Sequence, residues 1–167
     1  QSIVIPNSVT TIGDYVFAYC SNLTEITIPD SVTSIGTSAF SYCTKLTSIT
    51  IPGSVTTISD NLFSGSSQLV DIIMLEGVTS IGSYAFQNCT SLTSITIPES
   101  VTSMRGWPFT SYMTAIHLKS QVPPVLTGSV SISCNVNLKI YVPSGCAATY
   151  KTATNWARVA SLIVEEA

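Results

Sequence analysis

The sequence predicts a mainly β solenoid, a right-handed stack of parallel coils with a small α+β cap at its C-terminal end. The period is 23 residues, and one column of it holds every phenylalanine of the chain: Phe17, Phe40, Phe63, Phe86 and Phe109. A second column holds only valine: Val9, Val32, Val55, Val78 and Val101. A third holds only threonine: Thr10, Thr33, Thr56, Thr79 and Thr102. A constant period over five units indicates a solenoid, because one coil cannot bury its apolar side without stacked neighbours.

Composition excludes two classes of function. Charged residues make up only 9% of the chain, and the net charge is −3; an average domain carries roughly 25%. Because Lys and Arg form no cluster, the chain lacks the positive surface that phosphate binding requires, and we expect no nucleic-acid partner. No apolar run approaches the roughly 18 residues of a membrane-spanning helix, so we expect no membrane span in this chain.

Stacking itself accounts for the low charge. Parallel coils in register place the same repeat position of successive units about 4.8 Å apart. A charged residue in such a column would face its own kind, which is destabilising. Serine and threonine avoid this repulsion and fit a pleated surface, so they take the place of charge.

Each unit begins with a strand. In the segment 23–29, Ile26 and Ile28 alternate with Thr27, which is the period-two pattern of a strand with one buried face. Pro29 ends this strand, because proline has no N–H to donate to a further ladder bond.

A second short strand and a turn complete the unit. Ile35 points inward from this second strand, and Gly36 ends it. Ala39, Phe40 and Cys43 follow at i, i+1 and i+4, which predicts one helical turn, or an irregular segment, with its apolar face inward.

The repeats divide the chain into two parts. We expect residues 1–112 to form about five coils, the first of them truncated, and residues 113–167 to form the cap. Gln1 falls inside a repeat. A solenoid normally carries a capping unit at its end, so we expect this chain to be part of a protein that continues upstream.

Strand patterns persist in the expected cap. Ile116 and Leu118 repeat the spacing of a first strand, and residues 138–142 alternate like another one. Ser144 is expected to N-cap a short helix that runs to about Ala153. Three apolar side chains are expected to cover the open end of the core: Trp156, Leu162 and Val164.

The cysteines form a structural column rather than a metal site. Three of the five share one repeat position: Cys20, Cys43 and Cys89. Ser66 fills the same position in another coil, so we interpret these residues as buried thiols that serine can replace. Cys134 and Cys146 lie in the expected cap. The sequence leaves open whether these two cysteines form a disulfide.

Histidine offers no catalytic pattern either. His117 is the only histidine, and it lies between two inward-facing residues, so its side chain should face outward. The sequence shows no second histidine, no neighbouring carboxylate and no CxxC motif, so neither a triad nor a metal site has partners. We expect no enzymatic activity, no metal and no cofactor.

The repeat, read as Leu-x-x-Ile-x-Ile-Pro-x-x-Val-x-x-Ile-Gly-x-x-Ala-Phe-x-x-Cys, resembles the BspA-like (treponemal-type) leucine-rich repeat over residues 1 to about 112. The segments 122–125 and 139–145, with Trp156, resemble the terminal module that follows such repeats in surface proteins of gut anaerobes. The resemblance implies a parallel leucine-rich-repeat stack, a horseshoe-like scaffold of secreted or cell-surface proteins. It further implies adhesion to a host or bacterial surface protein, an extracellular or cell-surface location and no enzymatic activity.

The expected binding face is the outward side of the first strands, because its residues alternate with the buried ones. It comprises Glu25, Thr27, Ser48, Thr50, Asp71, Ile73, Leu75, Ser94, Thr96 and His117. Ile73 replaces the threonine of its column and Leu75 replaces the proline of the next. Two exposed apolar residues on a hydroxyl face can mark a contact site, although repeat drift would leave the same pattern.

The repeat is also broken at residues 104–108. Arg105 and Trp107 are residue types enriched at binding hot spots. They sit where the repeats meet the expected cap, however, and this position favours a structural role.

These patterns favour a secreted or surface-displayed module that binds a protein without catalysis. The alternative is a structural spacer that holds another domain away from the cell surface, because nearly identical neutral coils suit that role as well. A glycan-binding role is disfavoured, since we expect most aromatic rings to be buried.

Overall fold

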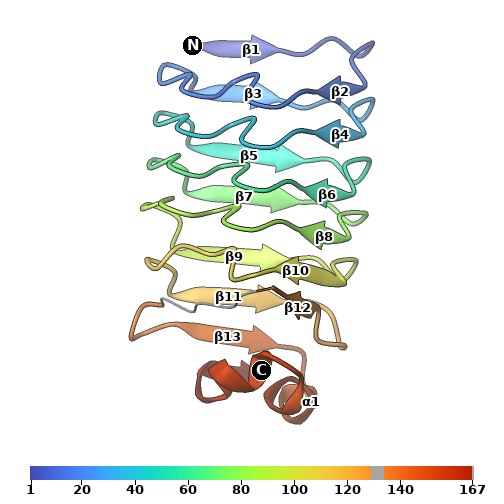
Figure 1. Cartoon of the computed structure of the whole chain (residues 1–167), viewed down its shortest axis with the longest axis vertical. Coiled ribbons are helices and arrows are strands. Elements are labelled where there is room, and N and C mark those ends of the chain that lie inside the picture. The colour runs from blue at the N-terminus through green and yellow to red at the C-terminus, as the bar shows by residue number, and fades with distance from the viewer. Residues whose placement is uncertain (129–133, 167) are drawn as a thin grey trace.

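The computed structural model describes residues 1–128 and 134–166 of the chain. Each coil except that of β13 contributes one strand to each of two columns, and the coils stack along the long axis of the molecule (Figure 1). The first strands are β1 (Ser2–Val4), β3 (Glu25–Thr27), β5 (Ser48–Ile51), β7 (Asp71–Met74), β9 (Ser94–Ile97), β11 (Ala115–Leu118) and β13 (Lys139–Val142). The second strands are β2 (Thr11–Ile12), β4 (Ser34–Ile35), β6 (Thr57–Ile58), β8 (Ser80–Ile81), β10 (Ser103–Arg105) and β12 (Val125–Thr127).

The pairing between coils is parallel and in register. Ile49 of β5 pairs with Ile72 of β7, and Ile58 of β6 pairs with Ile81 of β8, each partner lying one repeat along. The predicted parallel solenoid is therefore confirmed.

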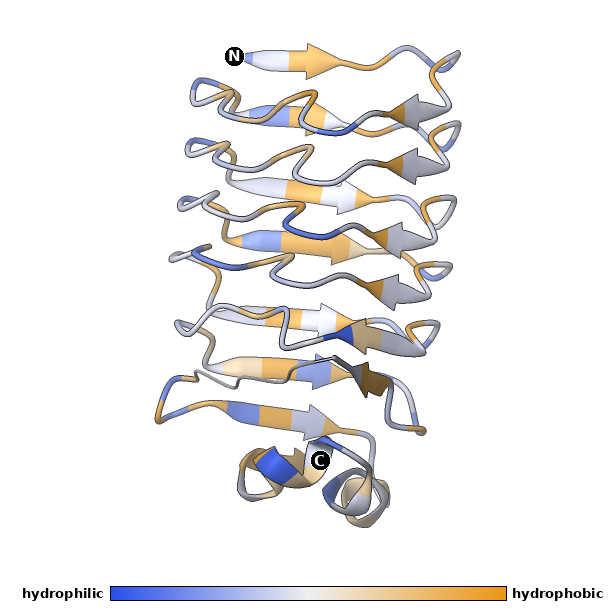
Figure 2. Ribbon diagram, viewed as in Figure 1, coloured by the Kyte–Doolittle hydropathy of each residue, from blue (hydrophilic) through white to orange (hydrophobic). Residues whose placement is uncertain are grey.

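The core is built from the repeat columns. Figure 2 shows apolar bands at matching positions of successive strands. The phenylalanine rings form one continuous stack, with centroids 5.2 Å apart between Phe17 and Phe40 and 6.2 Å apart between Phe86 and Phe109. Phe40 and Phe63 are completely buried. Each coil thus covers the apolar side of its neighbour, as the period requires.

The cysteine column is also internal. Cys43 and Cys89 are buried, and Ser66 between them has no exposed surface. Cys20 is only partly buried, so the expectation of a buried thiol is wrong at that position. Burial raises the pKa of both thiols to about 12. All five cysteines are free, so the disulfide considered between Cys134 and Cys146 is not formed.

Coil stacking continues beyond residue 112, where we expected the repeats to end. β11 pairs with β9 and β13 pairs with β11, while β12 pairs with β10. β11, β12 and β13 therefore belong to coils beyond the roughly five that we expected. The division at residue 112 stays a prediction about domains, but the two sheets cross it.

A small helical part closes the C-terminal end (Figure 1). It contains α1 (Ala147–Thr152), the 3₁₀ helix η1 (Trp156–Leu162) and β14 (Ile163–Glu165), which pairs with β13. Trp156 is buried, and its indole N–H donates to the carbonyl of Pro124 at 2.7 Å. The Tyr150 hydroxyl donates to the carbonyl of Ser120 at 2.7 Å. These two bonds anchor the helices to the last coils.

The start of α1 differs from expectation. Cys146 occupies the N-cap position without a side-chain bond, so the expected cap by Ser144 is wrong. The carboxylate of Glu165 instead accepts a hydrogen bond from the Ala147 N–H at 3.1 Å, because β14 returns beside the helix start. This bond holds the pKa of Glu165 below its usual value.

Candidate binding surface

The outward side chains of the first strands share one face of the solenoid. Nine of the ten residues that we assigned to this face are exposed, and the tenth, His117, is half-buried. Hydroxyl groups dominate the face, because Thr27, Thr50 and Thr96 share one column across three coils.

Two aliphatic side chains interrupt the hydroxyl columns. Ile73 is 48% exposed and Leu75, just after β7, is 45% exposed. Val4 of β1 is exposed in the same column as Ile73, so apolar residues occur twice in that column. Only in the coil of β7 does the aliphatic pair occur together.

Leu75 also has a structural role. Its backbone N–H donates to the carbonyl of Ile51 in the preceding coil at 3.1 Å. Lys119, which follows β11, donates to Ile97 in the same way at 3.0 Å. The coils of Pro52 and Pro98 cannot make this bond, because proline carries no N–H.

The first-strand sheet is divided where these prolines occur. β5 pairs with β7 and β9 pairs with β11 over four residues each. No ladder joins β3 to β5, or β7 to β9, within the part of the chain that the structure describes. β1–β3 and β11–β13 pair over three residues although Pro29 and Pro143 follow β3 and β13. A proline therefore shortens the ladder, and in two places the ladder is lost.

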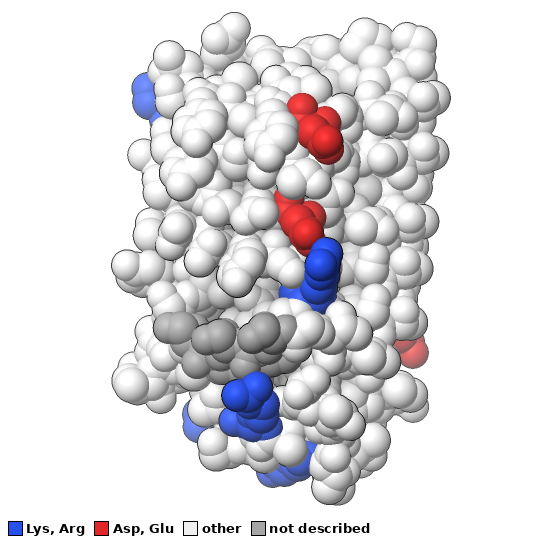
Figure 3. Space-filling model, in the orientation of Figure 1, with Lys and Arg blue, Asp and Glu red and all other residues white. Residues whose placement is uncertain are grey.

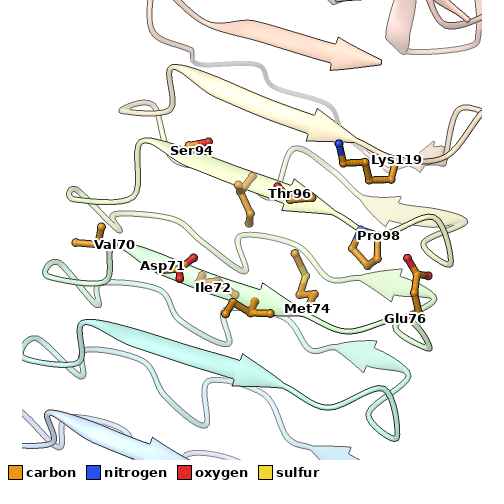
Figure 4. Close-up of a pocket in the computed structure, with 11 residues that line it drawn as sticks. Val70, Asp71, Ile72, Met74, Glu76, Ser94, Thr96, Pro98 and Lys119 are labelled. Carbon is orange, nitrogen blue, oxygen red and sulfur yellow. The ribbon is translucent and has the colours of Figure 1, made fainter. Parts of the chain in front are cut away.

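The gap between β7 and β9 is a groove on the outward face of the first strands (Figure 4). Its volume is about 570 Å³, and Figure 4 labels nine residues around it, from Val70 at one end to Lys119 at the other. A smaller hollow of about 320 Å³ lies on β3 and β5 and is also lined by Asp71 and Ile73. Ile73 therefore borders both hollows.

At the C-terminal end of the face, His117, Lys119, Glu166 and Tyr141 form a cluster joined by ion pairs and ring stacking. The Nδ1 atom of His117 lies 2.8 Å from a carboxylate oxygen of Glu166, and the Lys119 ammonium lies 2.9 Å from the other oxygen. The His117 ring stacks on Tyr141 at 4.6 Å. The hydrogen bonds from Lys119 and His117 keep the pKa of Glu166 low. His117 thus has a carboxylate partner that lies 49 residues away in the sequence.

The opposite, turn side of the coils exposes aromatic rings. Figure 3 shows the molecule in the orientation of Figure 1, and most of the surface on this side carries no charged side chain. Tyr19 and Tyr42 stack with centroids 4.9 Å apart and both are exposed. Three more tyrosines are exposed: Tyr15, Tyr84 and Tyr112. The argument against glycan binding assumed that most aromatic rings are buried. Most of the phenylalanine rings are buried but these tyrosine rings are exposed, so the argument does not hold.

The irregular segment 104–108 packs into the structure. Trp107 is buried, with its ring edge-to-face on Phe109 at 5.0 Å. Arg105 remains exposed and forms an ion pair with Asp60, two coils away, at 3.3 Å. Burial supports the structural role inferred for Trp107.

Two kinds of functional feature are absent from residues 1–128 and 134–166. No group of three or more His, Cys, Asp or Glu side chains is placed to hold a metal ion. Nor does any helix in this part have the length and apolar character to cross a membrane.

Comparison with known proteins gives a consistent result. A model of the BspA-type leucine-rich-repeat region matches residues 1–115 in six copies. A search of curated proteins found no match. A leucine-rich repeat protein from Bacteroides ovatus is similar at 26% identity and a TM-score of 0.76, covering 100% of this chain and 42% of that one.

Two further solved structures share the fold at lower identity. The pneumococcal vaccine antigen PcpA is 22% identical with a TM-score of 0.80, covering 99% of this chain and 40% of its own. The leucine-rich repeat protein of T. pallidum is 20% identical with a TM-score of 0.68, covering 99% of this chain and 85% of its own. This chain spans less than half the length of the Bacteroides and pneumococcal proteins.

Proposed function

The chain belongs to the BspA-type leucine-rich-repeat family, and we propose that it is a non-catalytic protein-binding module of a secreted or cell-surface protein. The ligand, a host or bacterial surface protein, contacts the outward face of the first strands. Family membership supports this class, because stacked repeats present extended surfaces that suit protein ligands.

The observation that carries the proposal is the aliphatic pair Ile73 and Leu75. Both side chains are close to half exposed on a face of hydroxyl groups, and Ile73 borders both hollows of that face. Apolar side chains that lose water at the centre of an interface supply much of its binding energy. We therefore assign the centre of the contact to β7.

Capture of host and bacterial surface proteins with this chain identifies the ligand, and a double variant then tests the site. Ile73→Thr with Leu75→Ser removes both aliphatic side chains, while serine, unlike proline, keeps the backbone N–H that bonds to Ile51. We expect binding to weaken by about 1–3 kcal/mol, the transfer free energy of two partly buried aliphatic side chains.

Tyr84→Ser, on the turn side, is the matched control, because Tyr84 is exposed to a similar degree. An unchanged dissociation constant in the double variant would remove β7 from the contact. If no protein is captured in a broad screen, the chain is better described as a structural spacer.

A further inference from the structure

We propose that a small pocket on the turn side of the coils, between the turns 84–88 and 107–111, binds one neutral sugar unit of a glycan. The site lies outside the outward face of the first strands, so the inference does not rest on the protein-binding surface proposed above. It follows from three features of the pocket: an opening between two coils, an exposed aromatic ring and a rim of uncharged polar side chains.

The pocket lies where the turns of two coils are joined by fewer bonds than elsewhere. In the preceding coil, three backbone N–H groups donate to the next turn: those of Asn61, Phe63 and Gly65. In the coil of the pocket, Phe86 alone donates across among the described residues, to Pro108 at 2.9 Å, and the flanking N–H groups of Tyr84 and Asn88 make no equivalent bond. The Phe86 bond keeps the two coils together, so a ligand rests in the surface opening rather than between them.

The irregular segment 104–108 accounts for the opening. Four coils have a residue with left-handed backbone in one column: Tyr15, Ser38, Asn61 and Tyr84. Trp107 fills this column in the next coil, but there the left-handed conformation falls one residue earlier, on Gly106 with a φ of 65°. The Gly106 carbonyl therefore does not take the position of an acceptor for Tyr84. The Thr110 carbonyl, the equivalent acceptor for Asn88, bonds to the Met113 N–H instead at 3.3 Å.

Tyr84 supplies the exposed aromatic surface of the pocket. Its side chain is 54% exposed. Its ring takes part in none of the ring pairs among the described residues, whereas Tyr19 and Tyr42 cover each other. Trp107 and Phe109 add buried apolar walls in edge-to-face contact. A sugar ring presents C–H groups on one face, and these pack on an aromatic ring as other apolar groups do.

The polar side chains of the pocket favour a neutral ligand. Gln87, Asn88 and Ser111 are exposed there, and their amide and hydroxyl groups both donate and accept hydrogen bonds, as sugar hydroxyls do. None of the residues that line the pocket is charged, so nothing there offsets the loss of water from an ionic ligand. The pocket volume is about 270 Å³. Pockets for drug-sized ligands measure roughly 300–1,000 Å³, so this one suits a single ring.

Trp107 also carries an unpaired donor. Its Nε1 atom is the one buried side-chain nitrogen or oxygen without a hydrogen-bond partner in the described part of the chain. The indole N–H of Trp156, by contrast, donates to Pro124 at 2.7 Å. A buried donor without a partner is unfavourable, so a sugar oxygen that reaches it as the Trp107 side chain adjusts gains affinity.

Substitutions that the repeat itself contains test the site with little risk to folding. Tyr84→Ser removes the exposed ring, and Ser38 already fills this column with a φ of 56°. Asn88→Gly removes the amide, and Gly65 fills that column with a φ of 79°. Tyr15→Ser is the matched control, because Tyr15 shares the column of Tyr84 and is 61% exposed but lies outside the pocket.

The probe is an array of neutral glycans and of their sialylated and sulfated forms, followed by titration with the free sugar that binds best. We expect neutral glycans to bind, and Tyr84→Ser to weaken binding about tenfold or more through loss of the aromatic contact. Tyr84→Phe keeps the ring and should stay within about threefold of the wild-type chain. Asn88→Gly should bind about three- to tenfold more weakly, the value of a hydrogen bond. Tyr15→Ser should bind normally.

The indole N–H resonances give a second readout on the intact wild-type chain. Saturating sugar should shift the signal of Trp107 and leave that of Trp156 unchanged. Binding of acidic glycans alone, no binding of any glycan, an unshifted Trp107 signal or an equal loss in Tyr15→Ser would each overturn the proposal. Binding of a proline-rich peptide in place of every glycan would assign the pocket to a protein ligand instead.

The two proposed sites fail independently. Ile73→Thr with Leu75→Ser should keep sugar binding, and Tyr84→Ser should keep the protein ligand. Loss of sugar binding in the double variant on the first strands would contradict a separate site on the turn side.

Discussion

The hydroxyl of Ser66 donates a hydrogen bond to the backbone carbonyl of Phe40 at 2.8 Å and accepts one from the N–H of Cys43 at 3.1 Å. Thiols make the first of these bonds in other coils, because Cys43 donates to Phe17 and Cys89 donates to Phe63, each at 3.1 Å. Serine can replace cysteine in this column because both side chains carry a short donor. The column is therefore a set of buried bonds between coils as well as apolar packing.

Removing the donor at position 66 should cost more than exchanging it. Ser66→Ala leaves the Cys43 N–H and the Phe40 carbonyl buried without these partners, and we expect it to lower the free energy of unfolding by about 1–3 kcal/mol. Ser66→Cys should cost less, because a thiol makes the equivalent bond in the neighbouring coils. Urea unfolding of the two variants compares them, and equal losses would contradict a role for the bond.

Thiol labelling tests the burial of the same column. The pKa of Cys43 and Cys89 is about 12, so at pH 8 almost none of their thiolate is present. We expect iodoacetamide to leave both residues unmodified in the folded protein and to modify the three partly exposed cysteines, Cys20, Cys134 and Cys146. In concentrated urea all five cysteines should react. Rapid labelling of Cys43 without denaturant would mean that this column opens to solvent.

The phenylalanine stack should dominate stability. Phe40→Ala and Phe63→Ala each remove a completely buried ring that stacks on a ring in both adjacent coils. We expect each to destabilise by about 3–5 kcal/mol, the usual cost of truncating a buried phenylalanine. A loss below about 1 kcal/mol in urea unfolding would be incompatible with a core made of this column.

The repeat columns predicted the fold, because in a parallel solenoid each column is also a line of contacts in space. Ile26 and Ile49 could be assigned to the core from sequence alone. The coils beyond residue 112 were harder to predict. Ile95, Ile116 and Ile140 occupy equivalent positions in β9, β11 and β13, but their spacing departs from 23 residues.

The outward face could be predicted from strand alternation, whereas its details depend on distant contacts. Nothing near His117 in sequence indicates Glu166, which β14 brings back to the face. The groove is not evident from the sequence either, because a proline such as Pro98, like Pro29 in its own unit, indicates by itself only that a strand ends there. Its larger effect, the missing ladder between β7 and β9, becomes visible only when neighbouring coils are compared.

The interactions of Glu166 with His117 and Lys119 should make the stability of the fold depend on pH. Lys119 and His117 lower the pKa of Glu166 from the ordinary value of 4.5. A carboxyl whose folded-state pKa is depressed stabilises the fold above its unfolded pKa, and this contribution is lost as the pH falls through the folded value. We expect Glu166→Gln to destabilise at pH 7 and to have little effect once the pH lies below the folded pKa. Thermal unfolding of both proteins across pH 2–7 measures this, and a constant difference would contradict the linkage.

The bond from Leu75 to Ile51 predicts that the repeat's own consensus residue is unfavourable in this coil. Leu75→Pro matches the other coils, yet it removes the N–H that donates to Ile51 at 3.1 Å. We expect a loss of about 0.5–1.5 kcal/mol, the net value of one hydrogen bond. The amides of β5 and β7 should also exchange faster with solvent, because a four-residue ladder is shortened. Leu75→Ser removes the same side chain and keeps the N–H, so it should preserve slow exchange. If both variants exchanged alike, the proline-free position would not hold this ladder closed, and Pro98 would not account for the open one between β7 and β9.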